Sequence, residues 1–124
     1  MRFAIAAISA LALAAPLAAE PGDMSVATFL EKAEKLKKKG PLALMSSDLK
    51  LLKGEVTGSA SAYRSKLKAD KAAGRAPHSC PPEAGSLNSD ELLKHYQSYP
   101  VAKRGSVTVR QGFYDMMKKR YPCR

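Results

Sequence analysis

The residues of this chain that could do chemistry are two cysteines and two histidines. His78 and Cys80 lie two positions apart, and together with His95 and Cys123 they could complete a Cys2His2 zinc site. Zinc sites of this type normally have closely spaced ligands at both ends of the motif, and here only one pair is close. In a small exported chain, two cysteines most simply pair with each other. We therefore expect a disulfide Cys80–Cys123, with zinc as the alternative, and two histidines that lie on the surface or are partly buried.

Neither the carboxylates nor the serines form a catalytic pattern. Glu31 and Glu34 fall on the surface of a predicted helix, and Asp90 and Glu91 fall at the start of another, where solvated or capping roles explain them. Neither histidine lies in a nucleophile motif, and paired cysteines leave no thiol to act as a nucleophile. We predict no catalytic residue, no cofactor and no metal, and hence a protein that is not an enzyme.

The first 19 residues have the order of a cleavable signal peptide. Arg2 is followed by an uncharged Ala/Leu/Ile run over residues 3–13, a break at Pro16, and the small residues Ala18 and Ala19. A membrane-spanning helix needs roughly 20 apolar residues, and Pro16 interrupts the run before that length is reached. We expect cleavage near Ala19 and export to the periplasm. An uncleaved N-terminal anchor is the alternative.

The charge of the chain restricts its partners. It has 21 Lys and Arg residues against 11 Asp and Glu residues, a net charge of +10, or +9 once Arg2 is lost with the signal peptide. Such a surface favours anionic partners: nucleic acid, anionic lipid, cell-wall polymer or an acidic protein. Nucleic acid is disfavoured, because export removes the chain from the chromosome and the lysine run over 35–39 suits the end of a helix. No stable membrane anchor is expected, because the apolar helix faces are needed for the core.

Apolar residues spaced three and four positions apart predict helices within residues 20–124, which we expect to form a single domain. The first helix spans 26–39, with Ser25 as its N-cap and Gly40 at its end. Its predicted core face consists of Val26, Phe29, Leu30, Ala33 and Leu36.

The second predicted helix is the longest, starting at 46–48 and continuing toward Gly74. Gly54 and Gly58 lie inside it, and because glycine weakens a helix, they predict a bend or a close neighbour there. Its core face consists of Leu49, Leu52, Val56, Ala60, Tyr63 and Leu67.

Residues 74–87 hold three prolines and two glycines and cannot continue the helix. Asn88 then caps a short third helix, with Glu91 in capping-box position, and a fourth helix begins near Ser106. The fold class we predict is all-α: a small four-helix domain with one disulfide, which fastens the proline-rich loop to the end of the last helix. The core residues of the last two helices are Leu92, Leu93, Tyr96, Val109, Phe113, Met116 and Met117.

The C-terminal part of the chain resembles a known family. Cys80-Pro81-Pro82 is followed by a polar gap, the helix Asp90-Glu91-Leu92-Leu93, Tyr99-Pro100, and a last helix ending in Tyr121-Pro122-Cys123. This pattern is similar to the Rap/Tai family of type VI secretion amidase-immunity proteins. The resemblance is clearest over 80–123 and extends to the first helices by order and length. Family members often carry further cysteines in the N-terminal helices, and this chain has none there.

The resemblance implies a periplasmic protein that binds and inhibits a peptidoglycan amidase toxin. It implies a protein partner, the amidase effector, and assigns no particular binding residue to this chain. The alternative is a non-catalytic, basic protein that binds the cell envelope or has a structural role there, without a toxin partner. Whether the chain forms a homo-oligomer stays open.

Overall fold

The computed structural model describes residues 20–83 and 87–124. The predicted signal peptide, residues 1–19, lies outside this part of the chain. The described residues form four α-helices and two short 3-10 helices and contain no strand beyond one isolated bridge between Ser25 and Thr108, which confirms the all-α prediction. In chain order the elements are α1 (Val26–Lys39), η1 (Gly40–Met45), α2 (Ser47–Ala72), α3 (Ser89–Gln97), η2 (Val101–Lys103) and α4 (Val109–Arg120).

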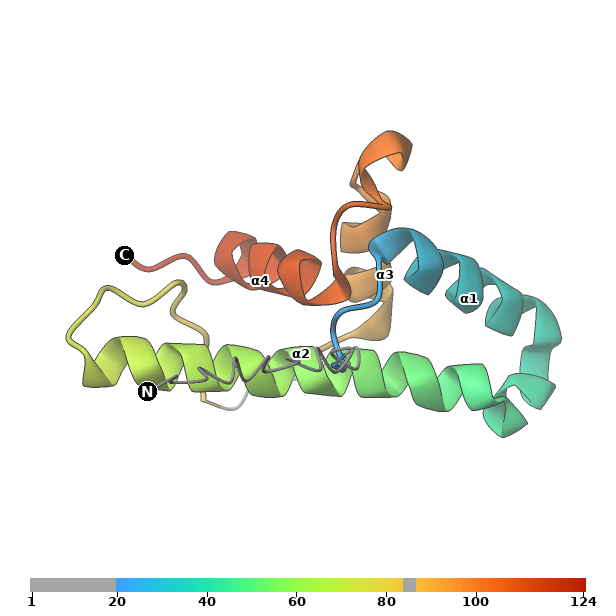
Figure 1. Ribbon diagram of the computed structural model, residues 1–124, viewed down its shortest axis with the longest axis horizontal. Coiled ribbons are helices and arrows are strands. Elements are labelled where there is room, and N and C mark those ends of the chain that lie inside the picture. Colours follow the sequence, from blue (N-terminus) through green and yellow to red (C-terminus); the bar gives the residue numbers. More distant parts are fainter. Residues whose placement is uncertain (1–19, 84–86) are drawn as a thin grey trace, which may run out of the picture.

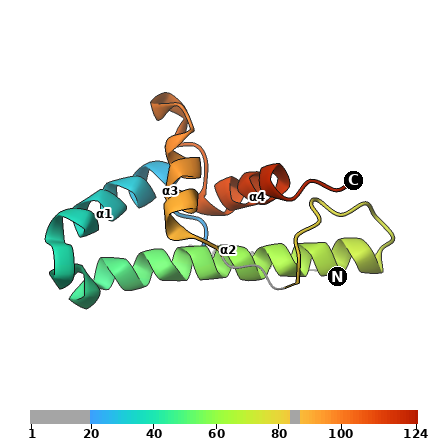
Figure 2. The same cartoon turned by 180° about the vertical axis from the view of Figure 1, so that it is seen from behind.

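The long helix α2 runs along the molecule, and the other helices lie on one side of it (Figure 1). α1 and α4 both pack against α2, one toward each of its ends, and α3 stands across the place where α1 and α4 meet (Figure 2). α3 packs against α1 and α4. The core therefore lies between α2 and the three shorter helices.

Polar side chains fix where the helices begin. Ser25 Oγ accepts a hydrogen bond from the backbone N of Thr28 at 3.1 Å, and Ser46 caps α2 as predicted. The predicted capping box of α3 takes another form: Asn88 Oδ1 accepts from Asp90 N at 2.8 Å, and the Glu91 carboxylate pairs with Arg120.

A full capping box occurs at α4, which begins at Val109, later than the predicted start near Ser106. Thr108 Oγ1 accepts from the backbone N of Gln111 at 3.0 Å, and Gln111 Oε1 accepts from the backbone N of Thr108 at 3.2 Å. These paired bonds satisfy two backbone donors that the first turn of a helix leaves open.

The core contains the residues that the helical spacing predicts, and aromatic rings hold its centre. Phe29 meets Tyr96 edge-on with ring centroids 5.2 Å apart, and the Tyr96 hydroxyl donates to the carbonyl of Val109 at 2.9 Å. The Tyr96 ring also covers Gly112, where a side chain would collide with it. The buried apolar residues are Val26, Phe29, Leu36, Leu52, Tyr63, Leu92, Tyr96, Val109, Phe113 and Met116.

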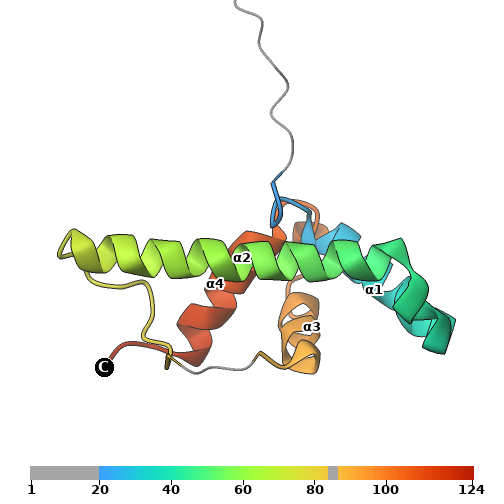
Figure 3. The same ribbon diagram turned by 90° about the horizontal axis from the view of Figure 1, so that it is seen from below.

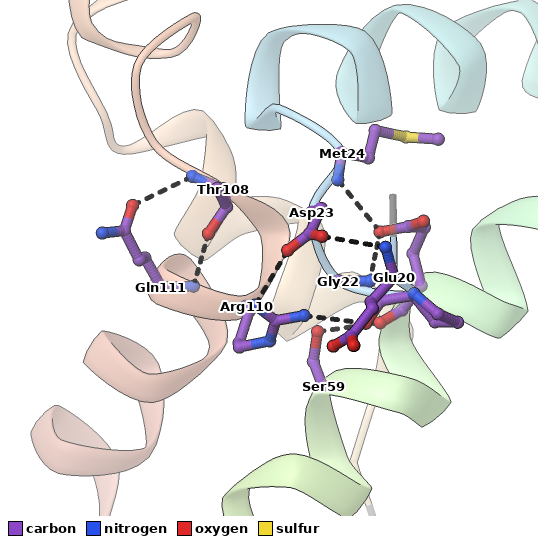
Figure 4. Close-up of polar contacts among 10 residues, drawn as sticks. Glu20, Gly22, Asp23, Met24, Ser59, Thr108, Arg110 and Gln111 are labelled. Carbon is purple, nitrogen blue, oxygen red and sulfur yellow. Dashed lines mark hydrogen bonds and ion pairs between the residues drawn. The ribbon is translucent and has the colours of Figure 1, made fainter. Parts of the chain in front are cut away.

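Residues 20–25, which we call the N-terminal strap, lie between α2 and α4 (Figure 4). The buried carboxylate of Glu55, on α2, accepts hydrogen bonds from the backbone N of Gly22 at 2.6 Å and of Met24 at 3.2 Å. On the other side, the carbonyl oxygens of the same two residues accept from the first turn of α4, from Arg110 N at 3.0 Å and Val109 N at 2.8 Å. The strap thus connects two helices through its own backbone.

The strap also explains one of the two glycines inside α2. A Cβ on Gly58 would lie 2.5 Å from Pro21 Cβ and 3.0 Å from the Pro21 carbonyl oxygen, whereas a Cβ on Gly54 would meet nothing within 4 Å. The predicted close neighbour is therefore confirmed at Gly58, and it is the strap.

The two glycines make a matched test of this packing. We expect Gly58→Ala to lower the free energy of unfolding by about 1–3 kcal/mol, because the added methyl must displace the strap backbone. Gly54→Ala, in the same helix, should raise it by up to about 1 kcal/mol through helix propensity alone. Urea denaturation followed by circular dichroism measures both. Equal effects of the two substitutions would contradict a strap that is packed on α2.

Candidate functional site

The segment between α2 and α3 begins with a stretch that the fold fixes in place, residues 73–83, which we call the tethered loop. Gly74 has a φ of 69°, a backbone conformation that glycine adopts readily, and it turns the chain back along α2. Arg75 holds this turn: its backbone N donates to the carbonyl of Asp70 at 2.8 Å, and its Nε donates to the Asp70 carboxylate at 3.2 Å. Asp70 is buried, so these two hydrogen bonds attach the turn to a residue inside the fold.

A disulfide ties the far end of the loop to the chain terminus, as predicted. Cys80 and Cys123 are bonded with their Cα atoms 5.0 Å apart, across 43 positions of sequence. Beside the disulfide, the backbone N of Cys80 donates to the carbonyl of Tyr121 at 2.8 Å. Figure 3 shows the loop running from the end of α2 to the segment that follows α4.

A buried tyrosine ties down the middle of the loop. The hydroxyl of Tyr63, on α2, is hydrogen-bonded to Nδ1 of His78 at 3.0 Å and to Oγ of Ser79. The centroid of the Tyr63 ring also lies 4.9 Å from that of the Tyr114 ring, on α4. Only 1% of Tyr63 and 2% of Ser79 is exposed. The sequence identified Tyr63 as a core residue and left its hydroxyl unassigned, because its partners lie 15 and 16 positions away.

The Tyr63–His78–Ser79 group brings a serine near a histidine, as in a hydrolase, yet its geometry is that of an anchor. The ring of His78 is hydrogen-bonded to Tyr63 and not to Ser79. The Ser79 hydroxyl therefore lacks the hydrogen bond to a base that would activate it as a nucleophile. The Ser79 hydroxyl is also buried, where no substrate carbonyl could reach it. The group fixes the loop and offers no accessible nucleophile.

The two histidines lie in separate places, and the zinc alternative is not borne out. His95, on α3, has its Nε2 3.1 Å from the hydroxyl of Tyr99, which in turn donates to the Asp115 carboxylate at 2.7 Å. Both cysteine sulfurs are used in the disulfide. Among residues 20–83 and 87–124, no three His, Cys, Asp or Glu side chains gather as metal ligands would.

Glu31 and Glu34, the first of the two carboxylate pairs that we considered as catalytic, have partners on their own helix. Glu31 pairs with Lys35 at 3.2 Å, and Glu34 pairs with Lys38 at 3.9 Å, both along the exposed side of α1. Each pair has the i, i+4 spacing that modestly stabilises a helix.

Exposed residues form the outer turn of the tethered loop. Arg75, Ala76 and Pro77 are exposed, as are the two disulfide cysteines, while Asp70, Tyr63 and Ser79 are buried and His78 is partly buried. Charges of both signs lie near the loop, since Lys66, Lys118, Asp70 and Asp115 all affect the titration of His78. This part of the molecule presents an exposed turn that is fixed to the core at several points.

Comparison with protein-family models, curated proteins and solved structures finds no match for this chain. In the part of the chain that the structure describes, no helix has the length and apolar character needed to cross a bilayer.

The anchoring of His78 predicts a pH dependence of stability. Burial, and then the positive charges of Lys118 and Lys66, lower the pKa of His78 below its ordinary value of 6.5, against opposing effects of Asp115 and Asp70. The unfolded chain therefore binds more protons than the folded chain just below that value. The free energy of unfolding should fall as the pH drops through about 6.5.

We expect His78→Asn to lose less stability than the unsubstituted protein between about pH 7 and about pH 5, because the amide cannot titrate. Burial also lowers the pKa of His95, so His95→Gln is the matched variant for the second histidine. Urea denaturation at each pH measures the difference. If His78→Asn has the same pH profile as the unsubstituted protein, His78 is not buried against Tyr63.

Removal of the disulfide gives a further prediction. Because it closes a loop across 43 positions, the double variant Cys80→Ser/Cys123→Ser should lose about 4 kcal/mol of unfolding free energy. Denaturation of the two proteins measures this loss, and mass spectrometry after thiol alkylation checks the starting state. Free thiols in the unsubstituted protein would contradict the pairing.

Proposed function

We propose that this protein is a periplasmic immunity-type protein that binds and inhibits a peptidoglycan amidase toxin of type VI secretion. The observation that carries the proposal is the tethered loop: an exposed turn whose two arms are both fixed to the helical core. We propose that this loop enters and covers the active-site cleft of the amidase.

Fixing a loop before binding favours inhibition. Association costs free energy for every segment that must be ordered, and a loop already held in one conformation avoids much of that cost. Here Asp70 fixes one arm, Tyr63 the middle, and the disulfide the other arm. Protein inhibitors of enzymes commonly change little in backbone conformation on binding, which is the behaviour that this arrangement favours.

Net charge and compartment support the same proposal. The chain as a whole has a net charge of +10, so an acidic rim around an enzyme cleft would attract it, although the loop itself carries one charge of each sign, Arg75 and Glu83. The predicted signal peptide would deliver the protein to the compartment that holds peptidoglycan, and a disulfide is compatible with that address. The Cys80-Pro81 and Pro122-Cys123 ends that resemble the immunity family are the residues that frame this loop.

The second candidate is a basic protein that binds anionic envelope polymer without a toxin partner. The exposed lysines of the chain favour it. Such binding would disappear at a few hundred millimolar salt, because salt screens contacts between exposed charges. Inhibition by a packed interface would persist at that ionic strength.

A matched pair of loop substitutions tests the immunity proposal. The purified protein is mixed with a peptidoglycan amidase toxin from the same genome, and hydrolysis of peptidoglycan is measured. We expect inhibition, and we expect Ala76→Glu to raise the inhibition constant at least about tenfold, since it places a charge in the proposed interface.

Ala102→Glu is the control. Ala102 is exposed, as Ala76 is, but it lies in η2, away from the tethered loop. This variant should inhibit as the unsubstituted protein does. No inhibition by the unsubstituted protein would overturn the function, and an equal loss from both substitutions would overturn the role of the loop.

A further inference from the structure

The turn between α1 and α2 exposes apolar side chains that the fold does not use. In η1, Leu42 is 70% exposed, Leu44 78% and Met45 87%. Ala43 is the residue of this turn that packs against the core. Single exposed apolar residues are common, but three within four positions are not needed to connect two helices. We call Leu42, Leu44 and Met45 the apolar corner.

Lysines flank the apolar corner along the chain. Lys37, Lys38 and Lys39 form the last turn of α1, and Lys50 and Lys53 lie in the first two turns of α2. From residue 37 to residue 53 the one acidic residue is Asp48, and Lys32 pairs with its carboxylate at 3.2 Å.

Most of these lysines are available to a partner. Lys38 lies 3.9 Å from Glu34, whereas Lys37, Lys39, Lys50 and Lys53 form no ion pair with any residue in 20–83 or 87–124. Lysines at the C-terminal end of α1 interact favourably with its helix dipole. This interaction does not explain the lysines near the start of α2, where positive charge is unfavourable. The corner is therefore both apolar and strongly positive.

The corner also protrudes. It forms one end of the long axis of the molecule, and the chain terminus and the tethered loop lie toward the other end (Figures 1 and 2). A flat surface could meet the corner without touching the rest of the fold.

We propose that the apolar corner docks on the surface of an anionic lipid bilayer. Leu42, Leu44 and Met45 would enter the boundary between headgroups and acyl chains, and the lysines around them would lie against the lipid phosphates. A few buried apolar side chains and a basic cluster are the two signals that together give reversible binding to anionic membranes.

Lipid fits this corner better than a protein does. A specific protein partner usually covers about 800 Å² of each surface with matched shape, and a small convex tip offers little of such an area. A bilayer needs no matching shape, because its headgroups move to accommodate the inserted side chains. Long lysine side chains can also lie along the apolar surface while their charges reach the phosphates.

Flotation with lipid vesicles tests the proposal. The purified protein is mixed with vesicles of phosphatidylcholine alone, or of phosphatidylcholine with one third phosphatidylglycerol. We expect it to float with the anionic vesicles only. The triple variant Leu42→Ser/Leu44→Ser/Met45→Ser should bind at least about tenfold more weakly, as should Lys37→Gln/Lys39→Gln/Lys50→Gln.

Each variant has a matched control elsewhere on the surface. Leu87→Ser/Val101→Ser removes exposed apolar side chains away from the corner, and Lys68→Gln/Lys71→Gln/Lys119→Gln removes the same number of charges. Both controls should bind vesicles as the unsubstituted protein does. All of the substituted side chains are exposed, so circular dichroism should show the same thermal unfolding throughout.

Three results would overturn the proposal. The first is no flotation of the unsubstituted protein with anionic vesicles. The second is an equal loss from the corner lysines and the control lysines, which would mean binding by net charge alone. The third is full vesicle binding by the Leu42/Leu44/Met45 variant together with weaker inhibition of the amidase, which would assign the corner to a protein partner. Flotation does not depend on the amidase, so each proposal can fail separately.

Discussion

The fold depends on one buried carboxylate. Glu55 lies on α2 and binds the backbone of the strap at Gly22 and Met24, and the strap backbone in turn binds the first turn of α4. A buried charge is costly unless hydrogen bonds compensate it, so this group holds the strap to one position. Pro21 then lies against Gly58, where α2 has no side chain. With α2 and α4 joined in this way, α4 carries the chain terminus to the place where Cys123 meets the loop.

Sequence patterns predicted the features that depend on local spacing. The helical stripes predicted the four helices and most of the core, and the serine and asparagine caps placed the starts of the first three; α1 has the bounds that Ser25 and Gly40 indicate, whereas α4 begins after Thr108 and not near Ser106. The disulfide was predicted from the expected export of the chain and from the presence of only two cysteines. The patterns did not reveal the strap, the Tyr63–His78–Ser79 anchor or η1. Glu55 and Tyr63 reach partners 15 to 33 positions away, and no local periodicity encodes such contacts.

The same fold therefore supports two kinds of surface. The tethered loop has a polar anchor on one arm and a covalent anchor on the other, so its exposed turn is ordered before any partner arrives. The side chains of the apolar corner are exposed, and of this turn only Ala43 packs against the core. An ordered loop suits a partner of fixed shape, and an exposed apolar tip suits a fluid one.

The length of α2 relates these surfaces to each other. Its 26 residues, at about 1.5 Å each, make a rod of roughly 39 Å with the corner at one end and the loop at the other. Substitutions so far apart in a rigid structure affect stability independently. The rod would also set a standoff height: a molecule resting on its corner would hold the loop clear of the headgroups. Substitutions in the tethered loop could therefore change the partner that it binds without changing the surface that the apolar corner binds.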